Sequence, residues 1–220
     1  MKRIIVLGGE GIGMIASSVI DRIGEGEVIG FLNDIVPVGT MLGRKKKIEV
    51  IGTFRDIERY LSEEDIQFMI AYGGMQREKS VFEKITNFPI PMERYYTAID
   101  PNSIVPTDYS DVGHGVLVAP YVQVGPDSVI EDNCILLGNS FIGHNTSIGR
   151  FSHIASNAVV GSYVTIGNAV HIGLNATIRE KVHIGDCAMV GAGAVVLNDV
   201  PENSIVVGNP ARILRVKGEA

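Results

Sequence analysis

The segment that decides the fold runs from Phe141 to Ile166 and has the sequence FIGHNTSIGRFSHIASNAVVGSYVTI. An aliphatic residue recurs in it at every sixth position, and the same register continues on both sides of the segment. A strict period of this kind indicates an internal repeat. The fifteen aliphatic members are Val112, Val118, Val124, Ile130, Leu136, Ile142, Ile148, Ile154, Val160, Ile166, Ile172, Ile178, Ile184, Val190 and Val196.

Two further positions of the repeat are restricted in size. Glycine follows nine of the fifteen aliphatic residues, and glycine tolerates tight turns that other residues resist. A small or β-branched residue lies four places after each aliphatic residue. Helices repeat at 3.6 residues and hairpin strands at two, so neither explains a period of six. The pattern predicts short strands with a corner every six residues and aliphatic side chains stacked inside.

With this register, residues 112–201 resemble the hexapeptide-repeat acyltransferases. The resemblance implies a left-handed parallel β-helix with three repeats per coil and about five coils. A β-helix scaffold without enzymatic activity is the structural alternative, because a fold alone does not fix a function.

The residues before the repeat alternate between strand and helix patterns. This alternation predicts a small Rossmann-like α/β domain at residues 1–98, followed by the all-β left-handed β-helix at residues 99–220. The expected strands are residues 3–9, 27–34 and 66–72, and the expected helices begin at residues 12, 54 and 76.

The sequences GGEGIG at residues 8–13 and GFLND at residues 30–34 narrow the resemblance to the PglD/NeuD-type sugar acetyltransferases, over nearly the whole chain. The resemblance implies that the N-terminal domain binds a nucleotide-linked sugar beyond the carboxyl ends of its strands. A tight turn without a ligand and an NAD site are the alternatives, although the glycines do not form GxGxxG. The implied substrate contacts are Gly8, Gly11, Gly13, Asn33 and Asp34.

Acyl transfer needs a group that removes a proton, and histidine suits this role near neutral pH. The repeat register sorts the five histidines of the chain. His153, His171 and His183 occupy the sixth place of a hexapeptide, whereas His114 and His144 occupy the third. His153 and His171 are eighteen residues apart, so they should stack on successive coils, while His183 should face elsewhere.

The segment around His144 is similar to the family segment that carries the catalytic base. The resemblance implies that His144 is the base and that His153, nine residues later, binds or orients the acetyl donor. Most family members follow the base with Asp or Glu, and this chain has Asn145 there. An amide can accept a hydrogen bond from the imidazole but contributes no charge. We therefore expect the catalytic pair to be His144 and Asn145.

The late segment from Val190 to Arg212 resembles the acyl-CoA end of these enzymes, although it could also simply close the β-helix. The resemblance implies acetyl-CoA as co-substrate, no metal, and a homotrimer with active sites between subunits. The implied acetyl-CoA contacts, besides His153, are Gly173, Gly191, Ala192, Gly208, Asn209, Pro210 and Ala211.

The leading functional hypothesis is N-acetylation of an amino sugar carried on a nucleotide, for surface glycan or polysaccharide synthesis. O-acetylation of a sugar or sialic acid, transfer of a longer acyl chain, and a non-catalytic binding module are the alternatives. A γ-type carbonic anhydrase shares the β-helix, but it binds zinc through three histidines, two of them five residues apart. No two histidines here have that spacing.

Composition excludes other classes of partner. A net charge of −6 with 19 Lys and Arg argues against a nucleic-acid or anionic membrane partner. No apolar stretch approaches the roughly 20 residues of a membrane span. Cys134 and Cys187 are not in a CxxC pair and suit a reducing compartment, so we expect a cytoplasmic protein.

Overall fold

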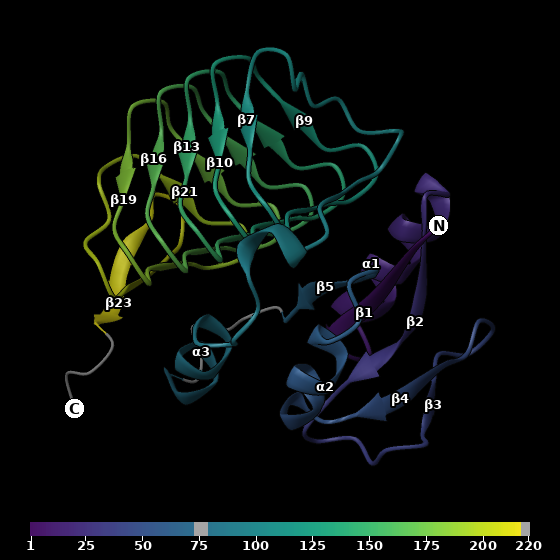
Figure 1. Ribbon diagram of the computed structural model, residues 1–220. Helices are drawn as coiled ribbons and strands as arrows, with labels where there is room; N and C mark the ends of the chain where they lie inside the picture. The colour runs from purple at the N-terminus through teal and green to yellow at the C-terminus, as the bar shows by residue number, and fades with distance from the viewer. Residues whose placement is uncertain (73–78, 217–220) are drawn as a thin grey trace.

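In a computed structural model of the chain, the described residues are 1–72 and 79–216. They form an α/β unit followed by a three-sided parallel β-helix (Figure 1). The fold class predicted from the sequence is therefore confirmed. No helix among these residues is long and apolar enough to cross a membrane.

The N-terminal sheet has the strand order β3-β4-β2-β1-β5. Strand β1 pairs in parallel with β2 on one side and β5 on the other, and all three strands carry buried apolar residues. The strands are β1 (Lys2–Gly8), β2 (Gly26–Leu32), β3 (Met41–Leu42), β4 (Ile48–Gly52) and β5 (Ile66–Ala71), and the helices are α1 (Ile12–Ile23), η1 (Phe54–Asp56), α2 (Ile57–Leu61), α3 (Lys79–Thr86) and η3 (Met92–Arg94).

The three strands expected in this domain correspond to β1, β2 and β5, and the expected helix at residue 54 is η1 with α2. The antiparallel pair β3–β4 was not predicted. The expected start of the last helix at residue 76 lies outside the described residues, and α3 is described from Lys79.

Each hexapeptide of the repeat contributes one two-residue strand, and the strands stack in three parallel sheets (Figure 1). We call them the β7–β19 sheet, the β9–β21 sheet and the eight-stranded sheet, which runs β23-β22-β20-β17-β14-β11-β8-β6. The strands are β6 (Ala98–Ile99), β7 (Asp111–Val112), β8 (Leu117–Val118), β9 (Gln123–Val124), β10 (Val129–Ile130), β11 (Ile135–Leu136), β12 (Phe141–Ile142), β13 (Ser147–Ile148), β14 (His153–Ile154), β15 (Val159–Val160), β16 (Thr165–Ile166), β17 (His171–Ile172), β18 (Thr177–Ile178), β19 (His183–Ile184), β20 (Met189–Val190), β21 (Val195–Val196), β22 (Ser204–Val207) and β23 (Arg212–Val216).

The interior of the β-helix is built from the aliphatic series. All its members from Val118 to Val196 are buried in one hydrophobic core, and Val112 packs against that core at its first coil. The size-restricted positions lie inside the corners. Where they are polar, they bond to a neighbouring coil: Ser128, Thr146 and Ser152 each donate a side-chain hydrogen bond to a glycine carbonyl fifteen residues later.

The repeat glycines serve a purpose other than the one we predicted. None of the nine has a positive φ, so tight turns do not require them. A Cβ on Gly143 would instead lie 2.5 Å from the backbone N of Ser162 in the next coil. The left-handed conformation occurs at the corner residue two places later, for example Asn145 with φ 55°. Asparagine is one of the few non-glycine residues that readily adopts it.

Helix α1 packs the N-terminal sheet onto the first coils of the eight-stranded sheet. Ala16, Val19 and Ile20 share a buried cluster with Leu117 and Ile135, whose side chains point outward from the β-helix. At the end of α1, Arg22 Nε lies 2.6 Å from Oδ2 of the buried Asp100. Burial raises the pKa of Asp100, but the hydrogen bonds from Arg22 and from the backbone of Asn102 outweigh it and hold that pKa below its usual value.

The division into domains 1–98 and 99–220 remains a proposal. It falls inside β6, which pairs in parallel with β8 and so begins the eight-stranded sheet.

Candidate active site

His144 lies at the corner between β12 and β13, where the β9–β21 sheet meets the β7–β19 sheet. Its side chain is exposed, and its Nδ1 lies 2.7 Å from Oδ1 of Asn145. An amide oxygen can only accept a hydrogen bond, so the imidazole proton is on Nδ1. The Nε2 lone pair is therefore available to accept a proton from a substrate.

The neighbouring coils hold this corner in place. The backbone N–H of Asn145 donates to the carbonyl of Pro126 at 3.0 Å, and that of Tyr163 donates to the carbonyl of His144 at 3.0 Å. The Tyr163 ring meets the His144 ring edge-on, with centroids 5.2 Å apart and planes at 83°. On the other side, a Cβ on Gly125 would lie 2.5 Å from the backbone N of His144. His144 is thus fixed between two coils.

His153 lies on β14, in the eight-stranded sheet, and is paired in register with His171 of β17. The predicted stacking of these two residues is confirmed, and His183 lies in a different sheet, as expected. The two Nδ1 atoms are 3.0 Å apart. Burial, and to a lesser extent the charge of His171, lowers the pKa of His153 to about 3, so the ring is neutral at pH 7.

The low pKa of His153 predicts that acid destabilises the protein. The unfolded chain binds a proton at this residue below a pH of about 6.5, whereas the folded chain does not until a pH of about 3. Stability from this residue is therefore lost as the pH falls from 6.5 towards 3. Between pH 7 and pH 5 we expect a loss of about 2 kcal/mol in the free energy of unfolding.

Urea titrations at the two pH values measure this loss. His153→Gln should remove most of it, while the same change at the exposed His183 should leave it in place. An equal pH dependence in the His153 variant would contradict the prediction.

The structure does not bring His144 and His153 together within one chain. His144 sits at the corner between the β9–β21 and β7–β19 sheets, and His153 points outward from the eight-stranded sheet. The β-helix is a three-sided prism whose sides are the three sheets. The corner that carries His144 joins two of these sides and lies opposite the third, the eight-stranded sheet. The two residues therefore face different surroundings.

The residues expected to contact acetyl-CoA gather at a second corner, between the eight-stranded sheet and the β9–β21 sheet. Gly173 and Gly191 follow β17 and β20 there, and Gly208 follows β22. The carbonyl of Gly208 accepts from Val195 N at 3.0 Å. Ala192 is exposed beside them, and the Asn209–Pro210 peptide is cis. Besides these glycines and Ala192, the corner exposes the larger side chain of Leu174, and the contacts with acetyl-CoA remain a prediction.

The glycine loop lies at the carboxyl end of β1, where strand order reverses between β2 and β5. Such switch points are where open α/β sheets bind ligands. A Cβ on Gly8 would lie 2.9 Å from the carbonyl of Ala71, and one on Gly13 would lie 3.2 Å from the Phe31 ring. Gly11, with φ 74°, precedes the twelve-residue helix α1, which has no side-chain cap at its N-terminus. Free N–H groups in that position favour an anion.

Asn33 and Asp34 make bonds within the protein at this edge of the sheet. Asn33 Nδ2 donates to the carbonyl of Gly8 at 2.9 Å, and its Oδ1 accepts from the N–H groups of Ile35 and Val36. Asp34 Oδ1 accepts from Phe54 N at 2.9 Å, and its other oxygen pairs with Lys84. Both residues shape the loops, and their contacts with substrate remain a prediction.

Sequence reasoning missed two residues at these sites. Tyr163 lies eighteen residues after Asn145, so the repeat register could have placed it next to His144. Lys84 pairs with Asp34 and its Nζ lies 5.1 Å from the centroid of the Phe54 ring. No sequence signal links these positions, because they come from separate elements of the domain.

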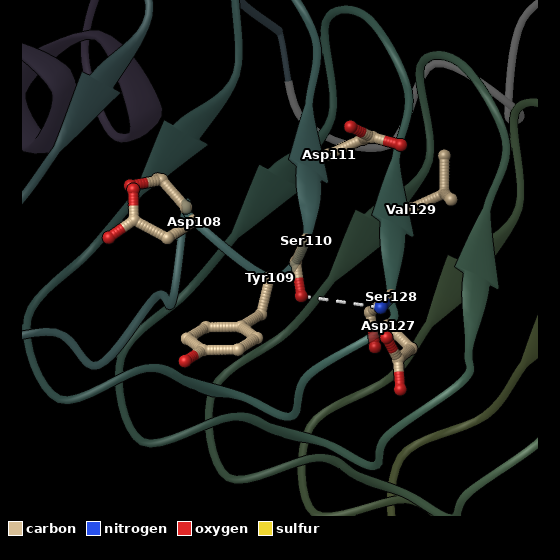
Figure 2. A pocket seen from close by; sticks show the side chains of 8 residues that line it. Asp108, Tyr109, Ser110, Asp111, Asp127, Ser128 and Val129 are labelled. Atoms are coloured by element: carbon tan, nitrogen blue, oxygen red, sulfur yellow. Dashed lines mark hydrogen bonds between the residues drawn. The ribbon is translucent and has the colours of Figure 1, made fainter.

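A cavity of about 490 Å³ opens on the first coils of the β-helix, beside β7 and β10. Figure 2 shows Asp108, Asp111 and Asp127 around it, with Ser110 Oγ accepting from the backbone N of Ser128. Its carboxylates would repel the phosphates of CoA. Within residues 1–72 and 79–216, no group of three or more His, Cys, Asp or Glu side chains is arranged to hold a metal ion.

Comparison with known proteins gives two family matches. Residues 3–85 match the PglD N-terminal domain, and residues 139–173 match the bacterial transferase hexapeptide of six repeats.

Solved structures match over almost the whole chain. The acetyltransferase domain of PglB from Neisseria gonorrhoeae FA1090 is 26% identical, with a TM-score of 0.84, over 97% of this chain and 100% of that one. The same domain in complex with acetyl coenzyme A gives 27% identity and a TM-score of 0.82, over 97% and 99%. PerB from Caulobacter crescentus, in complex with CoA and GDP-perosamine, shares the fold at 22% identity and a TM-score of 0.80, over 98% of both chains.

Proposed function

We propose that this chain, a hexapeptide-repeat acyltransferase with a PglD-type N-terminal domain, transfers an acetyl group from acetyl-CoA to the amine of a nucleotide-linked amino sugar. The observation that carries the proposal is the His144–Asn145 contact, which leaves the imidazole Nε2 able to accept a proton at an exposed corner of the β-helix. A full-length structural match to a domain that binds acetyl coenzyme A supports the choice of donor.

In the proposed reaction the sugar amine attacks the thioester carbonyl, a C–N bond forms, and the C–S bond breaks to release CoA. His144 Nε2 removes the proton that the amine must lose, and general base catalysis of this kind is worth about 10²–10⁴-fold. Asn145 holds the proton of the neutral ring on Nδ1, so that the lone pair is on Nε2. The leaving thiolate of CoA takes up the amine's proton from the imidazolium, which returns His144 to its neutral form and balances the step.

The substrates are assigned to surfaces that suit their chemistry. We place the diphosphate of the nucleotide sugar at the glycine loop and the free N–H groups of α1, with Gly8, Gly11, Gly13, Asn33 and Asp34 forming the site. We place the pantetheine arm of acetyl-CoA along the corner of Gly173, Gly191, Ala192 and Gly208 to Ala211, where Ala192 is exposed.

His144 and His153 act in one reaction only if two copies of the chain meet. Their places on opposite parts of the prism support a homotrimer in which the base of one subunit faces His153 of a neighbour. Cys134 and Cys187 do not form a CxxC pair, a cysteine usage that suits a reducing compartment, and we place the enzyme in the cytoplasm.

Asn145→Asp is expected to keep kcat or to raise it by up to about tenfold. The backbone accepts the change, because Asp127 already occupies the equivalent corner one coil earlier with φ 57°. A carboxylate in place of the amide would accept the same hydrogen bond from Nδ1 and would stabilise the protonated ring. Steady-state kinetics measure the effect. A large loss of kcat in a folded variant would show that Asn145 has another role.

Thiol release from acetyl-CoA, measured with a panel of UDP-, GDP- and dTDP-linked amino and hydroxy sugars, tests the function. Release with an amino sugar, together with an amide in the product, is the expected result. Release only with a hydroxy sugar would favour O-acetylation. Binding of acetyl-CoA without release would direct the search to other acceptors or longer acyl donors, and failure to bind acetyl-CoA at all would overturn the proposal.

A further inference from the structure

We propose that His171 is a positioning residue for acetyl transfer: its Nδ1–H donates to Nδ1 of His153 and so keeps the proton of His153 on Nε2, as a donor to the acetyl carbonyl. The inference rests on the proposed function. It assigns a role to a residue that does not itself contact the reacting atoms.

The two rings are coupled by their geometry. They lie on successive coils with Nδ1 atoms 3.0 Å apart, centroids 4.8 Å apart and planes tilted by 58°. When both rings are neutral, only one of the two facing nitrogens can carry a proton. The tautomer of one ring therefore fixes that of the other across this contact.

The surroundings of His153 point to a ligand. The corresponding outward positions on the neighbouring strands are apolar: Leu117 and Ile135 on one side, Met189 and Ile205 on the other. His153 is only 8% exposed, and its Nε2 is buried with no hydrogen-bond partner among residues 1–72 and 79–216. Leaving a buried polar atom unpaired costs about 1–3 kcal/mol. A bound carbonyl oxygen would supply the missing acceptor.

The position of the pair also suits the donor. Gly173, the first residue after β17, begins the corner assigned to the pantetheine arm, and His171 begins that same strand. The acetyl end of a donor that follows this corner can thus reach the eight-stranded sheet near the His153–His171 pair. Because the low pKa of His153 keeps its ring neutral, the single N–H on Nε2 would be its only donor group.

The chemical consequence concerns the transition state. Negative charge develops on the carbonyl oxygen when the amine attacks, and an N–H aimed at that oxygen stabilises the charge. If the proton of His153 moved to Nδ1, the Nε2 lone pair would instead repel the oxygen. His171 acts by excluding this second tautomer, so its loss should lower kcat more than it changes KM for acetyl-CoA.

His171→Phe removes the N–H donor and keeps a ring. The matched control is His183→Phe, which changes another histidine at the first position of a two-residue strand, on a different sheet. For wild type we expect the imidazole nitrogens of ¹⁵N-labelled protein at pH 7 to show His153 protonated on Nε2. In His171→Phe we expect a mixture of tautomers and a fall in kcat of about 10–100-fold, with KM for acetyl-CoA within about twofold. His183→Phe should match wild type in both readouts.

A wild-type spectrum with the His153 proton on Nδ1 overturns the inference, whether or not any variant folds. So does a folded His171→Phe variant with unchanged tautomer and unchanged kcat. If no acceptor is turned over, the proposed function fails, but the spectra of the free wild type and variant still decide the positioning role.

Discussion

His144→Ala is expected to lower kcat for acetyl transfer by about 10²–10⁴-fold, while the Kd for acetyl-CoA and the free energy of unfolding stay close to wild type. The imidazole side chain is exposed, so its loss leaves no cavity in the core. Its Nδ1 bonds only to the exposed amide of Asn145 in the described part of the chain, and water can replace that bond. What is lost is the lone pair of Nε2. Turnover kinetics and calorimetric titration with acetyl-CoA separate the two effects.

His114→Ala is the matched control, because His114 occupies the same place in its hexapeptide but lies at a different corner of the prism. It is also exposed, and its removal should leave kcat within about twofold. If His144→Ala kept wild-type kcat, the base would have to be another residue. Partial recovery of His144→Ala activity by added imidazole would support the assignment, since the free base can occupy the vacated space.

The repeat made the β-helix predictable to a degree that the α/β domain was not. Every member of the aliphatic series from Val118 onward is in the core, because a six-residue step and a three-sided coil leave no other inward position. The prediction that the repeat glycines are needed for tight turns was wrong, because none of the nine has a positive φ. The contact that excludes a Cβ at Gly143 is with Ser162, nineteen residues later, and no local propensity reports a contact between coils.

In the N-terminal domain, the sequence predicted where the loops after the strands lie, but not the hydrogen bonds that their side chains make. Asn33 and Asp34 were predicted as substrate contacts because the family resemblance implies them, at the carboxyl end of a strand. Their partners, the carbonyl of Gly8 and the N–H of Phe54, are 25 and 20 residues away and become visible only in the folded chain. The pair β3–β4 was missed because β3 has only two residues, too few to show a period.

The six-residue register also predicted correctly that His153 and His171 stack on successive coils, because eighteen residues make one complete coil. The nine-residue spacing between His144 and His153 instead separates the two residues. It spans one and a half hexapeptides, so His144 and His153 fall on different parts of the prism although they are near in sequence. The sequence could thus single out both residues although they lie on different parts of the prism.

Gly125→Ala is expected to lower kcat by about 10²-fold even though every proposed catalytic side chain remains. A Cβ at this position would lie 2.5 Å from the N and 2.8 Å from the Cα of His144, both backbone atoms. The coils can relieve the clash only by moving apart, which shifts the corner that carries the base. A displacement of about 1 Å from the reactive geometry is enough for a loss of this size.

The control must be a glycine whose replacement causes the same clash between coils at a site distant from His144. Gly185 meets this condition. A Cβ there would lie 2.4 Å from the backbone N of Glu202, at a corner of the prism other than that of His144. Both variants should lose about 1–3 kcal/mol of stability, because both force two coils apart. Only Gly125→Ala should lose activity at a temperature where both are folded. Equal losses of kcat would mean that activity follows stability, whereas a loss confined to Gly125→Ala would show that the spacing of two coils positions the base.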